Sequence, residues 1–78
     1  MKFFSRMFSE YAIQIHGASA SCVKGKIAGS VLRDIHSIAS ANGVLEGEIW
    51  IDKIGRVTFS NEIPSAIHQR LRNAVAPR

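Results

Sequence analysis

The fold of this 78-residue chain is decided by residues 47–60, which read GEIWIDKIGRVTFS. Apolar and polar side chains alternate on both sides of a short turn at residues 52–55, and this period-two pattern predicts a β-hairpin. The turn begins with Asp and ends with Gly, which suits a type I turn followed by a left-handed glycine. The side chains predicted to face the core are Ile49, Ile51, Val57 and Phe59. Trp50 should point to the opposite face.

A second hairpin is predicted upstream, where residues 10–16 alternate with the same period. The apolar residues at odd positions, Ile13 among them, share one face of this strand. Residues 17–19 form the turn, and a short strand over residues 20–24 should point Val23 toward the core. Four strands joined mostly by short turns favour an antiparallel sheet.

Two amphipathic helices complete the chain. Apolar side chains recur at helical spacing over residues 28–41, and Gly43 should end this helix in a left-handed conformation, which glycine adopts without a Cβ clash. Pro64 should open the second helix, because its missing N–H costs nothing at that position. The apolar stripes are Val31, Ile35, Ile38 and Ala39 on the first helix and Ile67, Leu71, Ala74 and Val75 on the second.

The two halves of the chain resemble each other at an offset of 36 residues. The matched positions include Ile13 with Ile49, Val23 with Phe59, Ile27 with Ile63, Val31 with Ile67, and Ile35 with Leu71. We therefore predict one α+β domain over residues 10–76, made of two duplicated ββα halves (10–43 and 46–76). It would be a two-layer sandwich in ββαββα order, with a four-stranded, mainly antiparallel sheet and both helices on one face. Residues 1–9 form an apolar and basic N-terminal tail.

Composition limits the classes of function. Hydrophobic residues make up 46% of the chain and charged residues 21%, as in an ordinary globular domain. The net charge of +4 and the pI of about 9.9 favour acidic partners such as nucleic acid or anionic lipid. Cys22 is the single cysteine, which excludes an internal disulfide and a multi-cysteine metal site and fits the reducing cytoplasm.

Residue types that carry catalysis are present but scattered. The three histidines and six carboxylates show neither metal-ligand spacing nor a general acid–base pair. The chain has no glycine-rich phosphate loop and no nucleophile elbow. We therefore expect no enzymatic activity, no cofactor, no metal and no small-molecule substrate.

Two surfaces are candidates for partner binding. On the sheet face opposite the helices, Trp50 lies with Lys24 and Arg56, which resembles the stacking and charge of single-strand-binding sheets. The alternative is that the N-terminal segment or a second subunit covers Trp50. The second surface is the polar side of the last helix, whose cations suit phosphates but are also expected from the helix dipole. Its residues are His68, Gln69, Arg70, Arg72 and Asn73.

The N-terminal tail carries Phe3, Phe4 and Phe8 with two cations. It is too short to cross a membrane, which takes about 20 apolar residues. One interpretation is a tail that lies over the domain. The other is a weak membrane-surface anchor, which would place a cytoplasmic protein at the periphery of the inner membrane.

A family resemblance rests on residues 59–64, Phe-Ser-Asn-Glu-Ile-Pro, and on residues 68–73, His-Gln-Arg-Leu-Arg-Asn. They resemble the F-S-x-[DE]-I-P and Q-R-[IL]-R-N signature of a bacterial family, domain-of-unknown-function family 3634. The resemblance extends to residues 23–25 and 38–39 and spans roughly residues 11–75. It implies a common fold and supplies no activity.

The leading interpretation is a small non-enzymatic interaction domain whose partner is another protein or a second copy of the chain. The first alternative is a nucleic-acid-binding module that uses the basic last helix or the Trp50 face. The second is a peripheral membrane protein held by its N-terminal tail.

Overall fold

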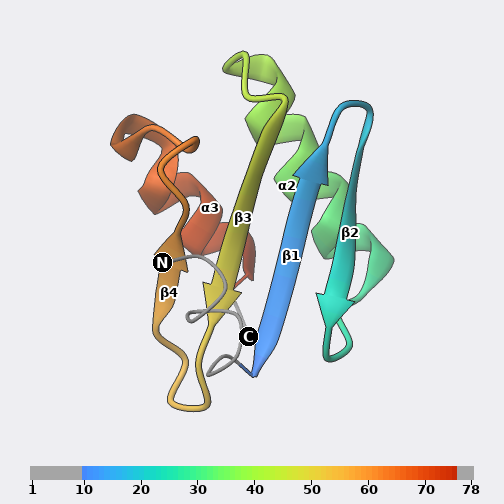
Figure 1. Ribbon diagram of the computed structural model, residues 1–78, viewed down its shortest axis with the longest axis vertical. Coiled ribbons are helices and arrows are strands. Elements are labelled where there is room, and N and C mark those ends of the chain that lie inside the picture. Colours follow the sequence, from blue (N-terminus) through green and yellow to red (C-terminus); the bar gives the residue numbers. More distant parts are fainter. Residues whose placement is uncertain (1–9, 76–78) are drawn as a thin grey trace.

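The computed structural model describes residues 10–75 and contains four strands and two α-helices (Figure 1). In chain order the elements are β1 (Tyr11–His16), β2 (Ser19–Lys24), α2 (Gly29–Ala41), β3 (Glu46–Ile51), β4 (Val57–Phe59), the 3-10 helix η1 (Ser65–Ile67) and α3 (His68–Val75). The strands form one sheet in the order β2-β1-β3-β4, and every neighbouring pair is antiparallel. Both helices lie on the same side of it (Figure 1). The predicted α+β class, the antiparallel four-stranded sheet and the two helices are confirmed.

The core lies between the sheet and the two helices. The period-two pattern of β1 and β3 places their isoleucines on one face, where Ile13 lies directly opposite Ile49. The helices bring their apolar stripes against that face, because helical spacing keeps such side chains on one side. The largest side chains that are essentially inaccessible to solvent are Ile13, Ile15, Ile35, Ile49, Ile67 and Leu71. Val31, predicted to be equally buried, is only half-buried.

The prediction that Val23 points toward the core is wrong, since 42% of it is exposed. The pairing of β1 with β2 shifts between Ala12 and Ile13, so that Lys24 lies opposite Ala12 and Cys22 opposite Ile13. Val23 is the extra residue of this bulge. Cys22 comes before it and lies directly opposite Ile13, so the two side chains share the core-facing side of the sheet. Cys22 therefore takes the core-facing position that the alternation assigned to Val23.

The end of α2 follows its predicted geometry. Gly43 has a φ of 75°. Its N–H donates to the Ser40 carbonyl at 3.1 Å, and the N–H of Val44 donates to the Ala39 carbonyl at 2.9 Å. These two bonds are those of a Schellman motif, in which a buried residue after the glycine packs against the helix. Val44, which is 6% exposed, is that residue.

The start of the second helix differs from the prediction. Pro64 has an extended backbone and lies outside the helix. A 3-10 turn follows it, with the Ile67 N–H donating to the Pro64 carbonyl at 3.2 Å, and regular α-helix begins at His68. A short 3-10 turn is common at the start of a helix, and here it brings Ile67 into the core.

Candidate interaction surfaces

The structure divides the predicted partner-binding residues between two sides of the molecule. Trp50 lies opposite Ala12 and Thr58 on the sheet face away from the helices, as predicted. Lys24 lies opposite Ala12 on the edge strand. The residues of α3 lie on the other side of the sheet (Figure 1). The predicted set therefore does not form one continuous surface.

Trp50 is buried, with 5% of its surface exposed. Its indole N–H donates to Glu48 Oε1 at 3.1 Å, which satisfies the one polar group of the ring. This burial occurs within a single copy of the chain, so it needs no second subunit. The indole face is therefore not available for stacking on a base. The prediction that the N-terminal tail covers it concerns residues outside the described range.

A truncation tests that prediction. Deleting residues 1–8 should shift the emission of Trp50 to longer wavelength. Water that reaches the indole reorients around its excited state and lowers the energy of that state. The emission of the full chain should not change on dilution, since Trp50 is buried within a single copy of the chain. An unchanged spectrum after truncation would show that residues 10–75 bury the indole by themselves.

Arg56 is occupied at the β3–β4 turn. Its Nε lies 3.4 Å from Asp52 Oδ2, and the exposed fractions of the two side chains are 69% for Arg56 and 34% for Asp52. Asp52 Oδ1 also accepts the main-chain N–H groups of Ile54 at 3.1 Å and of Arg56 at 2.8 Å. An exposed ion pair contributes little stability, so the structural role of Asp52 is to fix this turn.

On α3, two of the predicted residues pack on the aromatic ring of β4. The ring of His68 stacks on Phe59 with centroids 4.0 Å apart and planes 18° apart. The guanidinium carbon of Arg72 lies 5.4 Å from the Phe59 centroid, within cation–π range. His68 Nε2 lies 3.0 Å from the Ile63 carbonyl, to which it donates in the matching tautomer. His68, predicted on the polar side of the last helix, is thus half-buried and connects β4 to α3.

The remaining candidates on α3 are exposed. Gln69 Nε2 donates to Asn73 Oδ1 at 3.1 Å, one helical turn away. Arg70 is likewise exposed, about 100° around the helix from Gln69. The polar side of α3 therefore combines two residues that pack on Phe59, His68 and Arg72, with an exposed pair joined by a hydrogen bond, Gln69 and Asn73.

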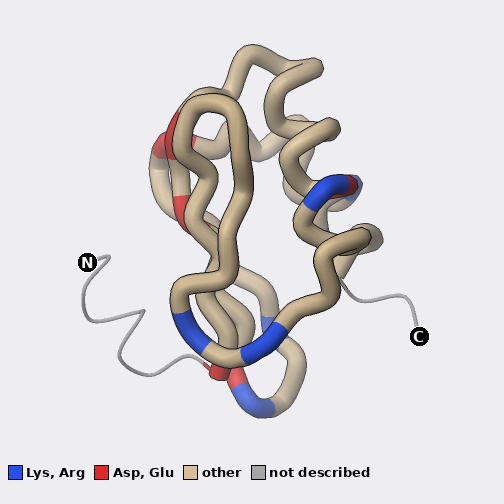
Figure 2. Tube along the Cα trace, turned by 90° about the vertical axis from the view of Figure 1, so that its right-hand side faces the viewer, with Lys and Arg blue, Asp and Glu red and all other residues tan. Residues whose placement is uncertain are grey.

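The positive charge of the chain is concentrated outside the described domain. Residues 10–75 hold seven Lys and Arg against six Asp and Glu, which leaves a net charge of +1. The other three cations are Lys2, Arg6 and Arg78. Within the domain, most Lys and Arg residues lie near one end of the sheet, and several Asp and Glu residues lie near the other (Figure 2).

A groove that sequence reasoning did not find runs between β2 and α2. It has a volume of about 470 Å³ and is lined by Ala18, Ser19, Ala20, Gly29, Leu32, Arg33 and His36. His36 Nε2 lies 3.3 Å from the Gly17 carbonyl and closes one end of the groove against the β1–β2 turn. The available signal was the run of small residues at positions 18–22, which leaves room beside a strand.

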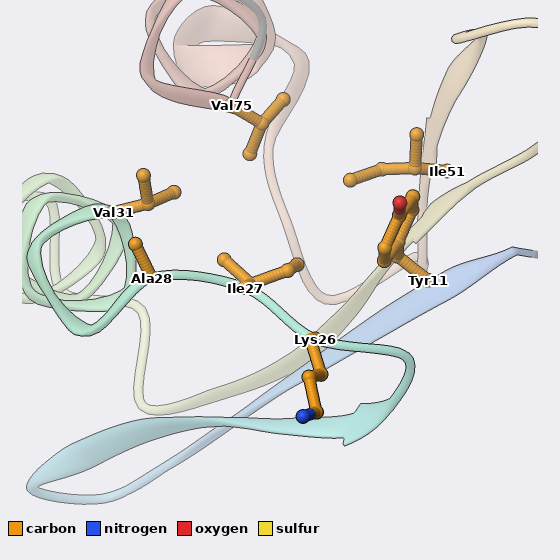
Figure 3. A pocket seen from close by; sticks show the side chains of 7 residues that line it. All are labelled: Tyr11, Lys26, Ile27, Ala28, Val31, Ile51 and Val75. Atoms are coloured by element: carbon orange, nitrogen blue, oxygen red, sulfur yellow. The ribbon is translucent and has the colours of Figure 1, made fainter.

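A cavity of about 240 Å³ lies between the start of α2 and the end of α3 (Figure 3). Its lining is mainly aliphatic, and the side chains of Ile27, Val31, Ile51 and Val75 point into a common space, whereas the Lys26 side chain points away from it (Figure 3). Val31 borders this space, which explains why it is only half-buried. The cavity therefore offers mainly apolar contact, with the ring of Tyr11 at its border.

Among residues 10–75, no three His, Cys, Asp or Glu side chains are grouped closely enough to hold a metal ion. No helix in that part of the chain combines the length and the apolar character needed to cross a membrane.

Comparison with known proteins places the chain in a family. No curated protein and no solved structure matches it. A family model described as "Protein of unknown function (DUF3634)" matches residues 4–78, which include the whole described domain. The predicted family is thereby confirmed, and the chain belongs to the DUF3634 family.

Proposed function

We propose that this protein is a non-enzymatic interaction domain that accepts an extended peptide from a partner protein as a fifth strand beside β2. The observation that carries the proposal is the open outer edge of β2 together with the groove between β2 and α2. No strand within residues 10–75 pairs with that edge. An unpaired edge presents main-chain donors and acceptors to a partner strand.

The pairing register identifies the groups that would bind the partner. Main-chain groups of successive residues in a strand point alternately to either side. The N–H of Gly17, just after β1, donates to the carbonyl of Leu45, just before β3, at 2.8 Å. The main-chain N–H and C=O groups of the odd-numbered residues of β1 therefore point toward β3. Ala20 and Cys22 lie opposite Ile15 and Ile13, and their own N–H and C=O groups therefore point away from β1. The bulge at Val23 ends this regular edge.

The groove supplies side-chain selectivity. In an added strand, every second side chain would lie over Ala20 and Leu32, where the small lining residues leave room for an aliphatic group. The groove is also bordered by the positively charged guanidinium of Arg33 and by the imidazole of His36. Asp34 lies one residue further along α2, about 100° around the helix from Arg33 and away from this side. We therefore expect an extended partner segment with alternating apolar residues and a carboxylate near Arg33.

We favour a peptide over nucleic acid because Trp50 is buried and residues 10–75 carry a net charge of only +1. The described β4 edge is a weaker candidate than β2, since β4 has three residues against six in β2.

Selection from a random dodecapeptide phage library tests the proposal. Enriched peptides should show period-two alternation, and a synthetic copy should give cross-strand NOEs to the amide of Ala20. Ala20→Pro removes the outward N–H without breaking a bond to β1 and should weaken peptide binding at least about tenfold, the effect of one lost main-chain bond and a displaced strand. Ala20→Ser keeps the N–H and should bind as the parent does.

Three results would overturn the proposal. One is the absence of any enriched peptide. Another is enrichment of peptides whose chemical-shift changes map away from β2 and α2. The third is equal binding by Ala20→Pro and Ala20→Ser, with both variants shown to be folded by their methyl NMR spectra.

We also propose that the two ββα halves arose by duplication and are related by a pseudo-twofold axis. The support is the β1–β3 register. Ile13 and Ile49, which are 36 residues apart, lie opposite each other, and the same offset exchanges the flanking pairs Ala12–Trp50 and Gln14–Glu48. The bulge in β2 has no counterpart in the three-residue β4, so the outer strands follow the relation less closely.

A further inference from the structure

The charged residues of the sheet are sorted toward its two ends (Figure 2). Lys24 ends β2, Lys26 follows it, and the β3–β4 turn carries Lys53 and Arg56. These residues share one end of the sheet, because Lys24 lies opposite Ala12 and Tyr11 lies opposite Ile51. We call this the basic end. It also contains Glu10 and Asp52, and its cations exceed its acids by two.

The opposite end is acidic. Glu46, Glu48 and Glu62 border one hollow there together with His16, and His16 Nδ1 lies 3.7 Å from Glu46 Oε2. The molecule therefore carries opposite charge at the two ends of its strands. An anionic surface would orient it with the basic end facing that surface.

The basic end also presents aliphatic side chains to solvent. Among the described residues, the exposed large hydrophobic side chains are Ile54 at 73%, Leu45 at 62% and Val23 at 42%. Ile54 lies in the turn between Lys53 and Arg56, and Val23 lies on the bulge next to Lys24. Leu45 lies at the acidic end, beside Glu46 and Glu62.

The turn that holds Ile54 is well defined. Its main chain is closed by the Gly55 N–H to the Asp52 carbonyl at 3.0 Å and by the Asp52 N–H to the Arg56 carbonyl at 3.0 Å. The Asp52 carboxylate adds bonds to two further N–H groups of the same turn. Ile54 therefore lies at the tip of an ordered turn, and 73% of it is exposed to solvent.

We infer that the basic end docks on an anionic lipid surface, with Ile54 and Val23 inserted among the acyl chains nearest the headgroups and the neighbouring cations at the headgroups. An aliphatic tip flanked by cations has the chemistry of such an interface. A nucleic-acid backbone would use the cations but offers no apolar layer for Ile54. The chain also enters the domain at this end, where the Glu10 N–H donates to the Ile51 carbonyl at 2.8 Å, and the residues before Glu10 include Phe3, Phe4 and Phe8.

This surface is separate from the groove between β2 and α2, so the inference stands without the proposed peptide binding. Each Lys or Arg near an anionic leaflet contributes about 1 kcal/mol of attraction, or about fivefold in partition coefficient. Binding through a few cations and two aliphatic side chains should therefore be reversible and sensitive to salt.

Vesicle sedimentation with the full chain tests the inference. The probes are vesicles of phosphatidylcholine alone and of phosphatidylcholine with about 30 mol% phosphatidylglycerol, which supplies the negative surface potential. The chain should bind the anionic vesicles and be released by about 0.5 M NaCl, which shortens the Debye length below 5 Å. Ile54→Ser and Lys53→Gln should each lower the partition coefficient about fivefold.

Leu45→Ser is the matched control, since it removes an exposed aliphatic side chain of similar accessibility at the acidic end. It should leave vesicle binding unchanged. Equal effects of Ile54→Ser and Leu45→Ser would overturn the inference, as would equal binding to neutral and anionic vesicles. Salt-sensitive binding to a single-stranded oligonucleotide without vesicle binding would assign the basic end to nucleic acid instead. Loss of all binding on deletion of residues 1–8, with no effect of Ile54→Ser, would assign it to the tail.

Discussion

Ile35→Ala should lower the free energy of unfolding by about 2–5 kcal/mol, the usual cost of truncating a buried Ile to Ala. Ile35 is completely buried at the centre of the interface between α2, the sheet and α3. A domain of this size rarely has more than about 3–5 kcal/mol of stability in total. The variant should therefore be largely unfolded at room temperature, as measured by urea denaturation followed by circular dichroism.

A graded series keeps this prediction testable if Ile35→Ala does not fold. Ile35→Val should cost only about 0.5–1.5 kcal/mol. Val31→Ala should cost less than Leu71→Ala, because Val31 borders the cavity whereas Leu71 is completely buried. The exposed Val23 provides the control, and Val23→Ala should change stability by no more than about 0.5 kcal/mol. Equal losses at Val23 and Ile35 would contradict the assigned core.

Gly25→Ala should cost about 2–4 kcal/mol, because it combines a left-handed backbone with a steric clash. Gly25 has a φ of 78° and follows β2 directly. A Cβ at this position would lie 2.5 Å from Tyr11 Cδ1 and 2.8 Å from the Glu10 carbonyl oxygen. The tyrosine ring can turn aside, but the carbonyl belongs to the main chain that enters β1. Thermal denaturation should show a much lower midpoint.

Gly43→Ala is the matched variant, since Gly43 has a nearly identical φ of 75° but open space where the Cβ of an alanine would lie. It should cost on the order of 1 kcal/mol, the conformational penalty alone. The difference between the two variants measures the clash at Gly25. If both lost the same stability, the close contact of Gly25 with β1 would be wrong.

The features that the sequence predicted correctly depend on short-range chemistry. The β3–β4 turn follows from an Asp that accepts nearby N–H groups and from a Gly at a position with a φ of 89°. The end of α2 follows from one glycine and the apolar residue after it. Ile13, Ile35 and Leu71 were assigned to the core because periodicity alone gives the buried face of a strand or helix.

The features that it missed depend on pairing between distant segments. Alternation in β2 predicts Val23 inward, but the face of each residue is set by its register with β1, which places Ala20 and Cys22 opposite the core residues Ile15 and Ile13. The bulge at Val23 depends on the same pairing. The burial of Trp50 likewise depends on tertiary contacts. The groove between β2 and α2 arises from the placement of Leu32 beside Ala20. The small residues at positions 18–22 leave the room for it, but they do not show which helix lies beside them.

For the candidate binding residues, the sequence predicts the face on which a side chain lies but not the side chains that it contacts. Trp50 was assigned to the correct face by its parity relative to Ile49 and Ile51. His68 and Arg72 were assigned to a polar helix surface, yet both contact the ring of Phe59. Stacking of a partly polar side chain on an aromatic ring leaves no periodic signature, because the same residue types occur on solvated faces.

The outer edge of β2 is open in the free protein, and amide hydrogen exchange measured by NMR on the full chain tests this most directly. The amides of Ala20 and Cys22 should exchange within about tenfold of the unfolded rate, since no main-chain acceptor within residues 10–75 lies on their side. The amides of Ile13 and Ile49, which point between the two central strands, should be protected to the level of global unfolding. Protection of Ala20 and Cys22 equal to that of Ile13 would show that the edge is already paired and would contradict the account.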